Sequence, residues 1–473
     1  MSFVSWAFVA LFLFVFVARL TIGRRKVEPA YVAVLLVASV VFYAWHIPAY
    51  IVILVTSAGV DYLAALALGR VPMAAAVKRR WILGVSLGVN LGLLGFFKYA
   101  NLLNDAVARA ARVAGIEVPI AEVSIVLPMG ISFYTFQSMS YTIDVYRGLL
   151  APMRSFKAFF LYIIFFPQLV AGPIVRAVDF LPQMSRPRRL RLKVFYEGVW
   201  LMIVGFFLKM VCADNLAVYV DAHWEAAYGE RATAAFATWL AVMFSGQIFA
   251  DFAGYSSIAR GLAYLLGYRL PINFNAPYIA GSLKEFWERW HITLSSWLRD
   301  YLYVPLGGNR RGRVRTYVNL LVVMVLGGLW HGAAYTYVMW GAIHGAALAV
   351  ERALGLQNDR GAARFALVRV AWFVVTQAVV LAAWVFFRSS SFENATAFLA
   401  NIAVMDFHLL DTWSWVGALF LLPIVVHHAW AWAEQRAIVR PLSAPARAVL
   451  AAVMVYGIVT LYSGTTAFIY FQF

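Results

Sequence analysis

LKEFWERWHITLSSWLRDYLYVPLGGN, residues 283–309, followed after a basic turn by GGLWHGAAYTYVMWGAIHG, residues 327–345, decides the fold of this chain. The first stretch holds tryptophans, a histidine and paired charges, and it is too polar to cross a bilayer as a plain helix. The second is an apolar run in which His331 stands between Gly328 and Gly332. An ionisable residue inside an apolar membrane segment is a functional candidate, because an unpaired polar group is costly in lipid.

The composition indicates an integral membrane protein. Of the 473 residues, 63% are hydrophobic and 13% are charged, and the mean hydropathy is +0.77. Soluble domains carry roughly 45–50% apolar and about 25% charged residues. We therefore expect one all-α, polytopic transmembrane domain over residues 1–473, with helices that cross the ~30 Å hydrocarbon core. The expected spans are 3–20, 31–47, 49–68, 81–98, 123–145, 158–175, 195–214, 233–265, 316–352, 366–387, 413–434 and 448–469.

The net charge of +17 lies in short loops between the apolar runs. This distribution is typical of positive-inside topology and of contact with anionic headgroups, so we expect membrane lipid as a partner and no nucleic acid. Loops 215–232 and 389–412 carry few basic residues and are expected outside, as are both termini. Five basic groups are expected to face the cytoplasm; they lie at 24–26, 70–80, 186–193, 310–315 and 436–447.

Three runs are expected to deviate from a straight span. Pro167 within 158–175 favours a kinked or re-entrant element, whose freed backbone groups protein or water must satisfy. The glycines of 233–265 favour a break in that helix. Crossing parity requires 316–352 to begin and end inside, which predicts a broken hairpin around His331.

Metal and phosphate-loop chemistry find no support in the sequence. The single cysteine, Cys212, permits neither an internal disulfide nor a multi-cysteine metal site. The His427–His428 pair lacks the spacing and the acid of an HExxH site, and neither a Walker A nor a GxGxxG loop is present. We expect no bound metal.

Residues 283–300 are predicted to form a short amphipathic helix. Lys284 with Glu288, and Glu285 with Arg289, stand at i,i+4 spacing, which stabilises a helix. Trp287, His291, Ser295 and Leu298 would share one of its faces. The alternative is an interfacial helix with tryptophans at headgroup level, and the two are compatible because such a helix can also line a cytoplasmic cavity.

His331 is the strongest catalytic candidate. An imidazole has an unperturbed pKa of about 6.5, which suits general-base chemistry at neutral pH. The flanking glycines allow a close approach of substrate or backbone and a break in the helix. The alternatives are a histidine hydrogen-bonded across a helix pair and, within enzymes, a transient acyl-histidine. His344, between Gly341 and Gly345, is expected to serve mainly in close helix packing.

Two other apolar runs carry polar side chains. Gln137 and Asp144 lie at i,i+7 and share a helical face, and Asp251 and Tyr255 lie together in a second run. Each pair is a candidate for interhelical hydrogen bonding. Together with His331 they are consistent with a polar path through the interior.

These stretches resemble the membrane-bound O-acyltransferase (MBOAT) family, in the branch of the alginate O-acetyltransferases. The resemblance extends from about residue 124 to the end of the chain. It is carried by the two stretches quoted above and by PMGISFYTFQSMSYTIDVYRG (128–148), FFPQLVAGPIVR (165–176), FADFAGYSSIARGLAYLLGYRLPINFNAPY (249–278) and FIYFQF (468–473).

The resemblance implies roles for particular residues. His331, the histidine of the WHG motif, would be catalytic, and His291 would be a second site residue. It also implies a ring of transmembrane helices around central re-entrant elements, with a cytoplasmic funnel. The candidate substrate- or donor-binding residues are Trp330, Ser295, Trp297, Asp300 and Tyr303, joined by Gln137 and Tyr255 of the polar runs.

The activity implied is transfer of acetyl from cytosolic acetyl-CoA to an extracytoplasmic acceptor at the bacterial cytoplasmic (inner) membrane. The acceptor would be an alginate-type exopolysaccharide, reached directly or through an SGNH-type acetyl carrier protein. Arg310, Arg311 or Arg313 would meet the CoA phosphates, since arginine matches phosphate geometry. The alternatives are D-alanyl or peptidoglycan acyl transfer and, from another class, a proton-coupled transporter.

Overall fold

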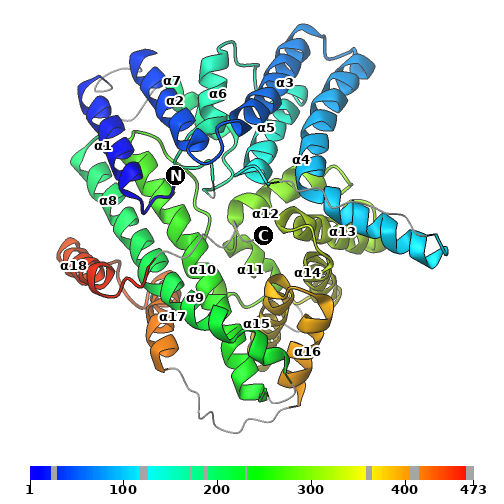
Figure 1. Ribbon diagram of the computed structural model, residues 1–473, viewed down its shortest axis with the longest axis vertical. Coiled ribbons are helices and arrows are strands. Elements are labelled where there is room, and N and C mark those ends of the chain that lie inside the picture. Colours follow the sequence, from blue (N-terminus) through cyan, green and yellow to red (C-terminus); the bar gives the residue numbers. More distant parts are fainter. Residues whose placement is uncertain are drawn as a thin grey trace. The chain divides into compact units, whose positions relative to one another are not determined.

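The computed structural model describes residues 1–22, 29–116, 126–170, 172–185, 190–229, 232–357, 365–404 and 415–464. In these ranges every regular element is a helix (Figure 1). Among the described residues, six helical segments are long and apolar enough to cross a membrane, and three shorter apolar helices accompany them. The chain is thus an all-α multi-pass membrane protein, as the composition predicts. The basic group 24–26, residues 186–189 and the FIYFQF end lie outside the described residues.

The chain divides into two compact units, residues 1–201 with 259–271, and residues 202–258 with 272–473. The prediction of a single domain over the whole chain stays a prediction. The helices that begin in the first unit are α1 (Trp6–Thr21), α2 (Pro29–Ala44), α3 (Tyr50–Arg70), α4 (Ala76–Val113), α5 (Ile131–Tyr146), α6 (Phe156–Ile164), α7 (Ala177–Ser185) and α8 (Leu192–Phe206).

The second unit holds the remaining elements. The longest is α10 (Ala234–Leu265), whose last turns belong to the first unit. The others are η1 (a π-helix, Phe207–Ala213), α9 (Asp214–His223), η2 (Glu225–Tyr228), η3 (Pro277–Ile279), α11 (Leu283–Arg289), α12 (Ile292–Leu298), η4 (a π-helix, Arg299–Tyr303), α13 (Arg313–His331), α14 (Tyr335–Ala353), α15 (Ala366–Arg388), α16 (Phe392–Ala403), α17 (Trp415–Gln435) and α18 (Ala444–Thr460).

A buried carboxylate connects three helices in the core of the first unit. Asp61 on α3 is fully buried and accepts hydrogen bonds from Ser86, Asn90, Ser138 and Thr142, of which the Asn90 and Thr142 bonds are both 2.9 Å long. These donors come from α4 and α5. Side-chain hydrogen bonds across helices stabilise membrane bundles, where water is absent. The carboxylate therefore fixes the three helices together.

The predicted irregularity of 158–175 is confirmed. α6 ends at Ile164, and residues 165–170 and 172–176 form no helix or strand. The carbonyl of Tyr162, near this end, accepts hydrogen bonds of 2.8 Å from both Gln137 and Gln168. Backbone groups freed inside a membrane protein need such partners. Gln137 is therefore held by the backbone of its own unit.

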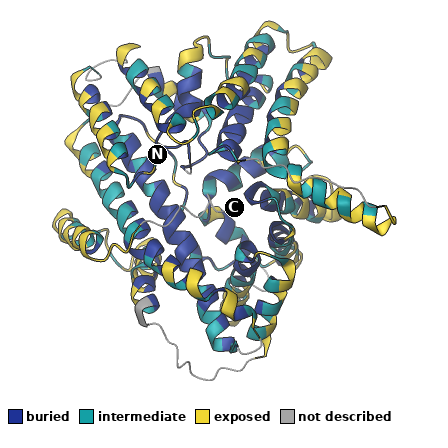
Figure 2. Cartoon of the chain, in the orientation of Figure 1, coloured by how far each residue is buried: buried dark blue, intermediate teal, exposed yellow. Residues whose placement is uncertain are grey.

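The predicted break in 233–265 is wrong, because α10 runs without interruption and is largely buried along its length (Figure 2). Its Gly254 serves another purpose. A Cβ there would lie 2.8 Å from the carbonyl oxygen of Gly205 and 3.0 Å from the amide nitrogen of Lys209. Glycine thus permits close packing of α10 against the chain around η1, and the helix has no reason to bend.

Beside this contact Lys209 is buried between two carboxylates, 2.7 Å from Asp214 and 2.8 Å from Asp251. A buried ammonium group requires such pairing. Asp251 therefore has an ion-pairing role in the second unit.

The hairpin predicted around His331 is confirmed. α13 ends at His331, Gly332 is extended, and α14 starts at Tyr335. The two helices pack through glycine. A Cβ on Gly341 would lie 2.3 Å from the carbonyl oxygen of Met324, and one on Gly328 would lie 2.1 Å from that of Tyr337. Small residues at such positions let helix backbones approach closely in membranes.

Candidate active site

The single helix predicted over residues 283–300 is wrong. In the 283–303 block α11 ends at Arg289, and α12 starts at Ile292 and continues as η4. The pairs themselves form, with 3.5 Å between Lys284 and Glu288 and 2.7 Å between Glu285 and Arg289. The break falls at His291, whose φ of +41° lies in the left-handed region that costs energy for a non-glycine residue. The amide of Ile292 instead donates to the carbonyl of Asn273 over 2.9 Å. Pairing with that upstream segment replaces the continuing helix.

His291 is fully buried and held by polar partners. Its Nδ1 lies 3.1 Å from Oδ1 of Asn273, an oxygen that also accepts from the Thr293 hydroxyl over 2.9 Å. The amide of Leu294 approaches the same Nδ1 at 3.4 Å. The shorter contact is to an atom that can only accept, so we assign the proton to Nδ1 and the lone pair to Nε2. Burial lowers the pKa of His291 to about 3, which keeps the ring neutral near pH 7.

His331 lies at the end of α13 and is 4% exposed. Its ring is surrounded by aromatic rings, with centroid distances of 5.0 Å to both Trp330 and Trp340 and 5.4 Å to Phe387. The ring of His291 lies 6.5 Å away. The structure therefore brings the two predicted site histidines and Trp330 into one aromatic cluster.

A cavity of about 400 Å³ lies beside this cluster. It is formed by α11, α12, η4, α13 and α14. Ser295 and Tyr303, two predicted binding residues, line it together with Trp287 and Leu298, so three members of the predicted common face do meet, whereas His291 is not among its lining residues. Three cationic side chains, Lys284, Arg299 and Arg352, line this cavity together with one carboxylate, Glu288, so its lining has a net positive charge.

The cavity follows the α13 face that ends at His331. Leu320, Val323 and Met324 line it. His331 lies seven residues beyond Met324, which is two helical turns and about 10 Å along the same face. On α14, Leu348 and Arg352 line the cavity and continue the face of Trp340 and His344 at i+4 steps.

The remaining predicted residues lie outside this cavity. Trp297 is buried and packs on Tyr301 at 5.1 Å, and Asp300 forms an exposed ion pair of 2.7 Å with Arg299. Tyr255 is buried on α10, and Gln137 belongs to the first unit. Their substrate-binding roles stay predictions.

Two residues that support the site were not predicted from the sequence. Glu351 on α14 is fully buried and accepts hydrogen bonds from the amides of Leu283 (2.5 Å) and Lys284 (3.1 Å) and from the indole of Trp372 (3.0 Å). Asn273 is the second, through its bond to His291. The available signal was a single glutamate in the apolar ALAVERA run, where an ionised group requires a partner.

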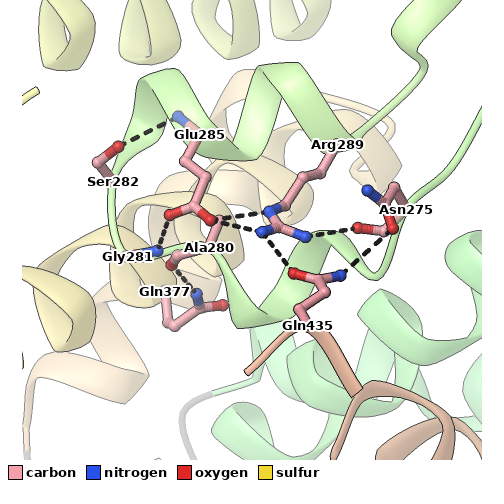
Figure 3. A network of polar contacts seen from close by, with 8 residues as sticks. All are labelled: Asn275, Ala280, Gly281, Ser282, Glu285, Arg289, Gln377 and Gln435. Carbon is pink, nitrogen blue, oxygen red and sulfur yellow. Dashed lines mark hydrogen bonds and ion pairs between the residues drawn. The ribbon is translucent and has the colours of Figure 1, made fainter. Parts of the chain in front are cut away.

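A second polar network holds the other end of α11 (Figure 3). Arg289 bonds Glu285 on its own helix, the carbonyl of Asn275 over 3.1 Å and Gln435 of α17 over 2.9 Å. Glu285 in turn accepts from the amide of Gly281 over 2.8 Å. Both ends of α11 are therefore fixed by named partners. In the part of the chain that the structure describes, no cluster of three or more His, Cys, Asp or Glu is arranged to hold a metal.

Comparison with known proteins decides the family. The profile of the membrane-bound O-acyltransferase family matches residues 148–390. A protein of Pseudomonas putida named probable alginate O-acetylase AlgI is 41% identical over 84% of this chain and 79% of its own length. The chain belongs to the membrane-bound O-acyltransferase family.

Other relatives carry different acyl chemistry in their names. A peptidoglycan O-acetyltransferase of Helicobacter pylori is 35% identical over 79% of this chain and 73% of its own length. A teichoic acid D-alanyltransferase of Bacillus subtilis is 29% identical over 46% and 56%. This MBOAT protein is therefore an acyltransferase of the AlgI-like branch, and the transporter alternative is set aside.

Proposed function

We propose that this protein transfers acetyl from cytosolic acetyl-CoA to a hydroxyl group outside the cytoplasm, for O-acetylation of an alginate-type exopolysaccharide. The acceptor is the polymer itself or an SGNH-type acetyl carrier protein. The observation that carries the proposal is the place of His331, at the end of the α13 face whose earlier turns line the cationic cavity. The AlgI name of the relatives supports the alginate-type acceptor.

The cavity suits an acyl-CoA donor in charge and in size. Lys284, Arg299 and Arg352 outnumber the one carboxylate of its lining, Glu288, and cations of this kind bind phosphates. Its 400 Å³ falls within the roughly 300–1,000 Å³ of small-molecule sites. The 310–315 turn before α13 is expected to face the cytoplasm, and this expectation supports a cavity that opens on the donor side. Arg310, Arg311 and Arg313 are exposed in that turn and extend the positive charge outward.

The proposed reaction is a direct acyl transfer. A lone pair on His331 takes the proton of the acceptor hydroxyl while the oxygen attacks the thioester carbonyl. A C–O bond forms, the C–S bond breaks, and the thiolate leaves and takes up the proton from the imidazolium. General-base help contributes about 10²–10⁴-fold, and positioning of the two substrates supplies more. In a second route His331 is itself acetylated and then deacylated by the alcohol.

His291 has a complementary role in this proposal. Its ring is neutral and held by Asn273 through Nδ1, and by our assignment the lone pair lies on Nε2. A neutral, oriented imidazole is suited to accept a hydrogen bond from a substrate hydroxyl near His331. We therefore place His291 with the acceptor and His331 with proton transfer.

The test uses the purified protein in liposomes with radiolabelled acetyl-CoA inside and acceptor outside. The wild type should transfer label, whereas His331→Ala should lose transfer by at least about 100-fold at an unchanged unfolding midpoint. Retained activity of His331→Ala contradicts the assignment. A parallel assay with a D-alanyl carrier protein, and one with peptidoglycan as acceptor, tests the chemistry named for the other relatives.

A further inference from the structure

Three buried rings beside His331 form a cluster of their own. Trp287 of α11 contacts His344 of α14 with ring centroids 5.0 Å apart, and Trp340 contacts His344 at 4.9 Å. The two indoles lie 5.6 Å from each other. His344 is fully buried, and the indoles are 9% and 1% exposed. The three rings therefore form a closed triangle inside the second unit.

The nitrogens of these rings are unusual for a protein interior. Both ring nitrogens of His344 and the indole nitrogens of Trp287 and Trp340 are buried without a hydrogen-bond partner among the described residues. In proteins the large majority of buried polar side-chain atoms have a partner. Other indole and imidazole nitrogens of the described residues share this property, Trp384 and His428 among them, but here four such atoms lie in one cluster and leave their hydrogen-bonding capacity to a ligand. A neutral imidazole offers one donor and one acceptor and each indole one donor, so the cluster presents three donors and one acceptor.

The cluster lies between the cationic cavity and His331. Trp287 itself lines the cavity, and so does Leu348, one helical turn beyond His344. On the other side Trp340 contacts His331 at 5.0 Å. Ring contacts therefore connect the cavity to His331 through Trp287, His344 and Trp340.

We propose that His344, Trp287 and Trp340 form a hydrogen-bonding subsite for the amide groups of the acyl donor's arm. This inference rests on the proposed function, because it takes a thioester donor for granted. The pantetheine arm of acetyl-CoA contains two amides, so it offers two carbonyl acceptors and two N–H donors. Indole N–H groups and one imidazole nitrogen donate to the carbonyls, and the second imidazole nitrogen accepts from an amide N–H. The same arm occurs on carrier-protein thioesters, so the chemistry is shared by both donor sources.

The experiment compares His344→Leu and His344→Gln over donors with decreasing numbers of amides. These are acetyl-CoA and S-acetylpantetheine with two, S-acetyl-N-acetylcysteamine with one, and S-ethyl thioacetate with none. Loss of one or two hydrogen bonds should raise the KM of His344→Leu for the two-amide donors roughly 5- to 50-fold. Its KM for S-ethyl thioacetate should stay at the wild-type value. His344→Gln keeps an amide donor and acceptor and should recover part of the loss.

Controls separate binding from folding. His428, buried on α17 and bonded to the carbonyl of Ile424 over 2.8 Å, gives the matched variant His428→Leu, which should show no dependence on donor amides. Where S-ethyl thioacetate reacts too slowly, inhibition by free pantetheine is measured. Its inhibition constant should rise in His344→Leu by the factor seen for the KM.

The outcomes are distinguishable. An equal rise of KM for all donors, or an unchanged inhibition constant for pantetheine, contradicts the proposed subsite. His344 would then serve in helix packing alone. A wild type that uses a carrier-borne thioester but not acetyl-CoA contradicts the proposed donor; an effect of His344→Leu on that thioester still supports the subsite. A wild type inactive with every thioester overturns both proposals.

Discussion

The 283–303 block and the α13–α14 hairpin hold their histidines by different means. In the block, hydrogen bonds hold the histidine and its helix in place. Asn273 orients His291, and Glu351 fixes the start of α11. In the hairpin, glycines bring the two backbones together, and aromatic rings surround His331. Hydrogen bonds fix orientation and tolerate conservative replacement, whereas close packing tolerates no added atom. Damage to the block should therefore be graded and damage to the hairpin severe.

The largest effect is expected from Gly341→Ala in the hairpin. The added Cβ would lie 2.3 Å from the carbonyl oxygen of Met324 and 2.8 Å from Cα of Val325, both backbone atoms that cannot rotate away. Overpacking of this kind costs about 1–3 kcal/mol or more of unfolding free energy. Displacement of α13 should also lower the acetylation rate. Thermal unfolding in detergent and the transfer assay measure the two effects.

Gly92→Ala in α4 is the matched control. It lies in a helix with no atom within 4 Å of the added Cβ. Alanine exceeds glycine in helix propensity, so its unfolding midpoint should stay equal or rise. If Gly341→Ala behaves like Gly92→Ala, the hairpin is not closely packed and the comparison fails.

A smaller, graded effect is expected at Glu351, which connects the two regions. Glu351→Ala removes the acceptor of two backbone amides and one indole N–H. Only the Leu283 amide is fully buried, and leaving it without an acceptor costs about 1–3 kcal/mol, whereas the partly exposed Lys284 amide and Trp372 indole can bond water instead. Lys284 lies in the first turn of α11, which Glu351 holds, and it also lines the cavity. The KM for acetyl-CoA should therefore rise as well. Glu351→Gln keeps one oxygen acceptor, so its unfolding midpoint and KM should lie between those of the wild type and of Glu351→Ala. Equal defects in both variants contradict a positioning role for the carboxylate.

The sequence predicted the membrane class, the hairpin and the irregularity within 158–175, because these follow from hydropathy, crossing parity and helix-breaking residues. It did not predict the continuity of α10, since Gly254 as a breaker and Gly254 as a packing site look alike until the partner at Gly205 is known. Nor did it predict the break at His291, which depends on pairing with Asn273, eighteen residues upstream. Long-range partners of this kind leave no periodic pattern.

The candidate site was predicted unevenly for the same reason. His331, His291 and Trp330 meet because the two stretches that contain them fold together, whereas Glu351 and Arg352 lie outside these stretches. His344 was expected to serve packing because its flanking glycines dominate the pattern. Its unbonded nitrogens appear only when the surrounding rings are placed.

The pH dependence of stability tests how His291 is buried in the block. Burial lowers the pKa of His291 to about 3 in the folded protein, whereas a histidine in the unfolded chain has a pKa of about 6.5. The unfolded state therefore binds more protons between these values, so stability is fully present above about pH 6.5 and falls as the pH falls toward 3. His291→Gln should flatten this dependence.

Between pH 5 and 8 His291 stays neutral, so His291→Gln should lower the transfer rate without moving the midpoint of its pH profile. The rate is measured across this window in both proteins. A shifted midpoint would show that His291, and not another group, titrates in the active enzyme.

The smallest effect on stability is expected at Asp300. Its ion pair with Arg299 lies between adjacent residues, and the Arg299 side chain is 64% exposed. Exposed pairs contribute about 0–1 kcal/mol, so Asp300→Asn should hardly change the unfolding midpoint. Arg299, however, also lines the cationic cavity. If Asp300 only restrains Arg299, the variant should alter the KM for acetyl-CoA modestly and leave kcat unchanged. A large loss of kcat at normal stability would instead place Asp300 against the reacting groups, and the block would then contribute chemistry as well as orientation.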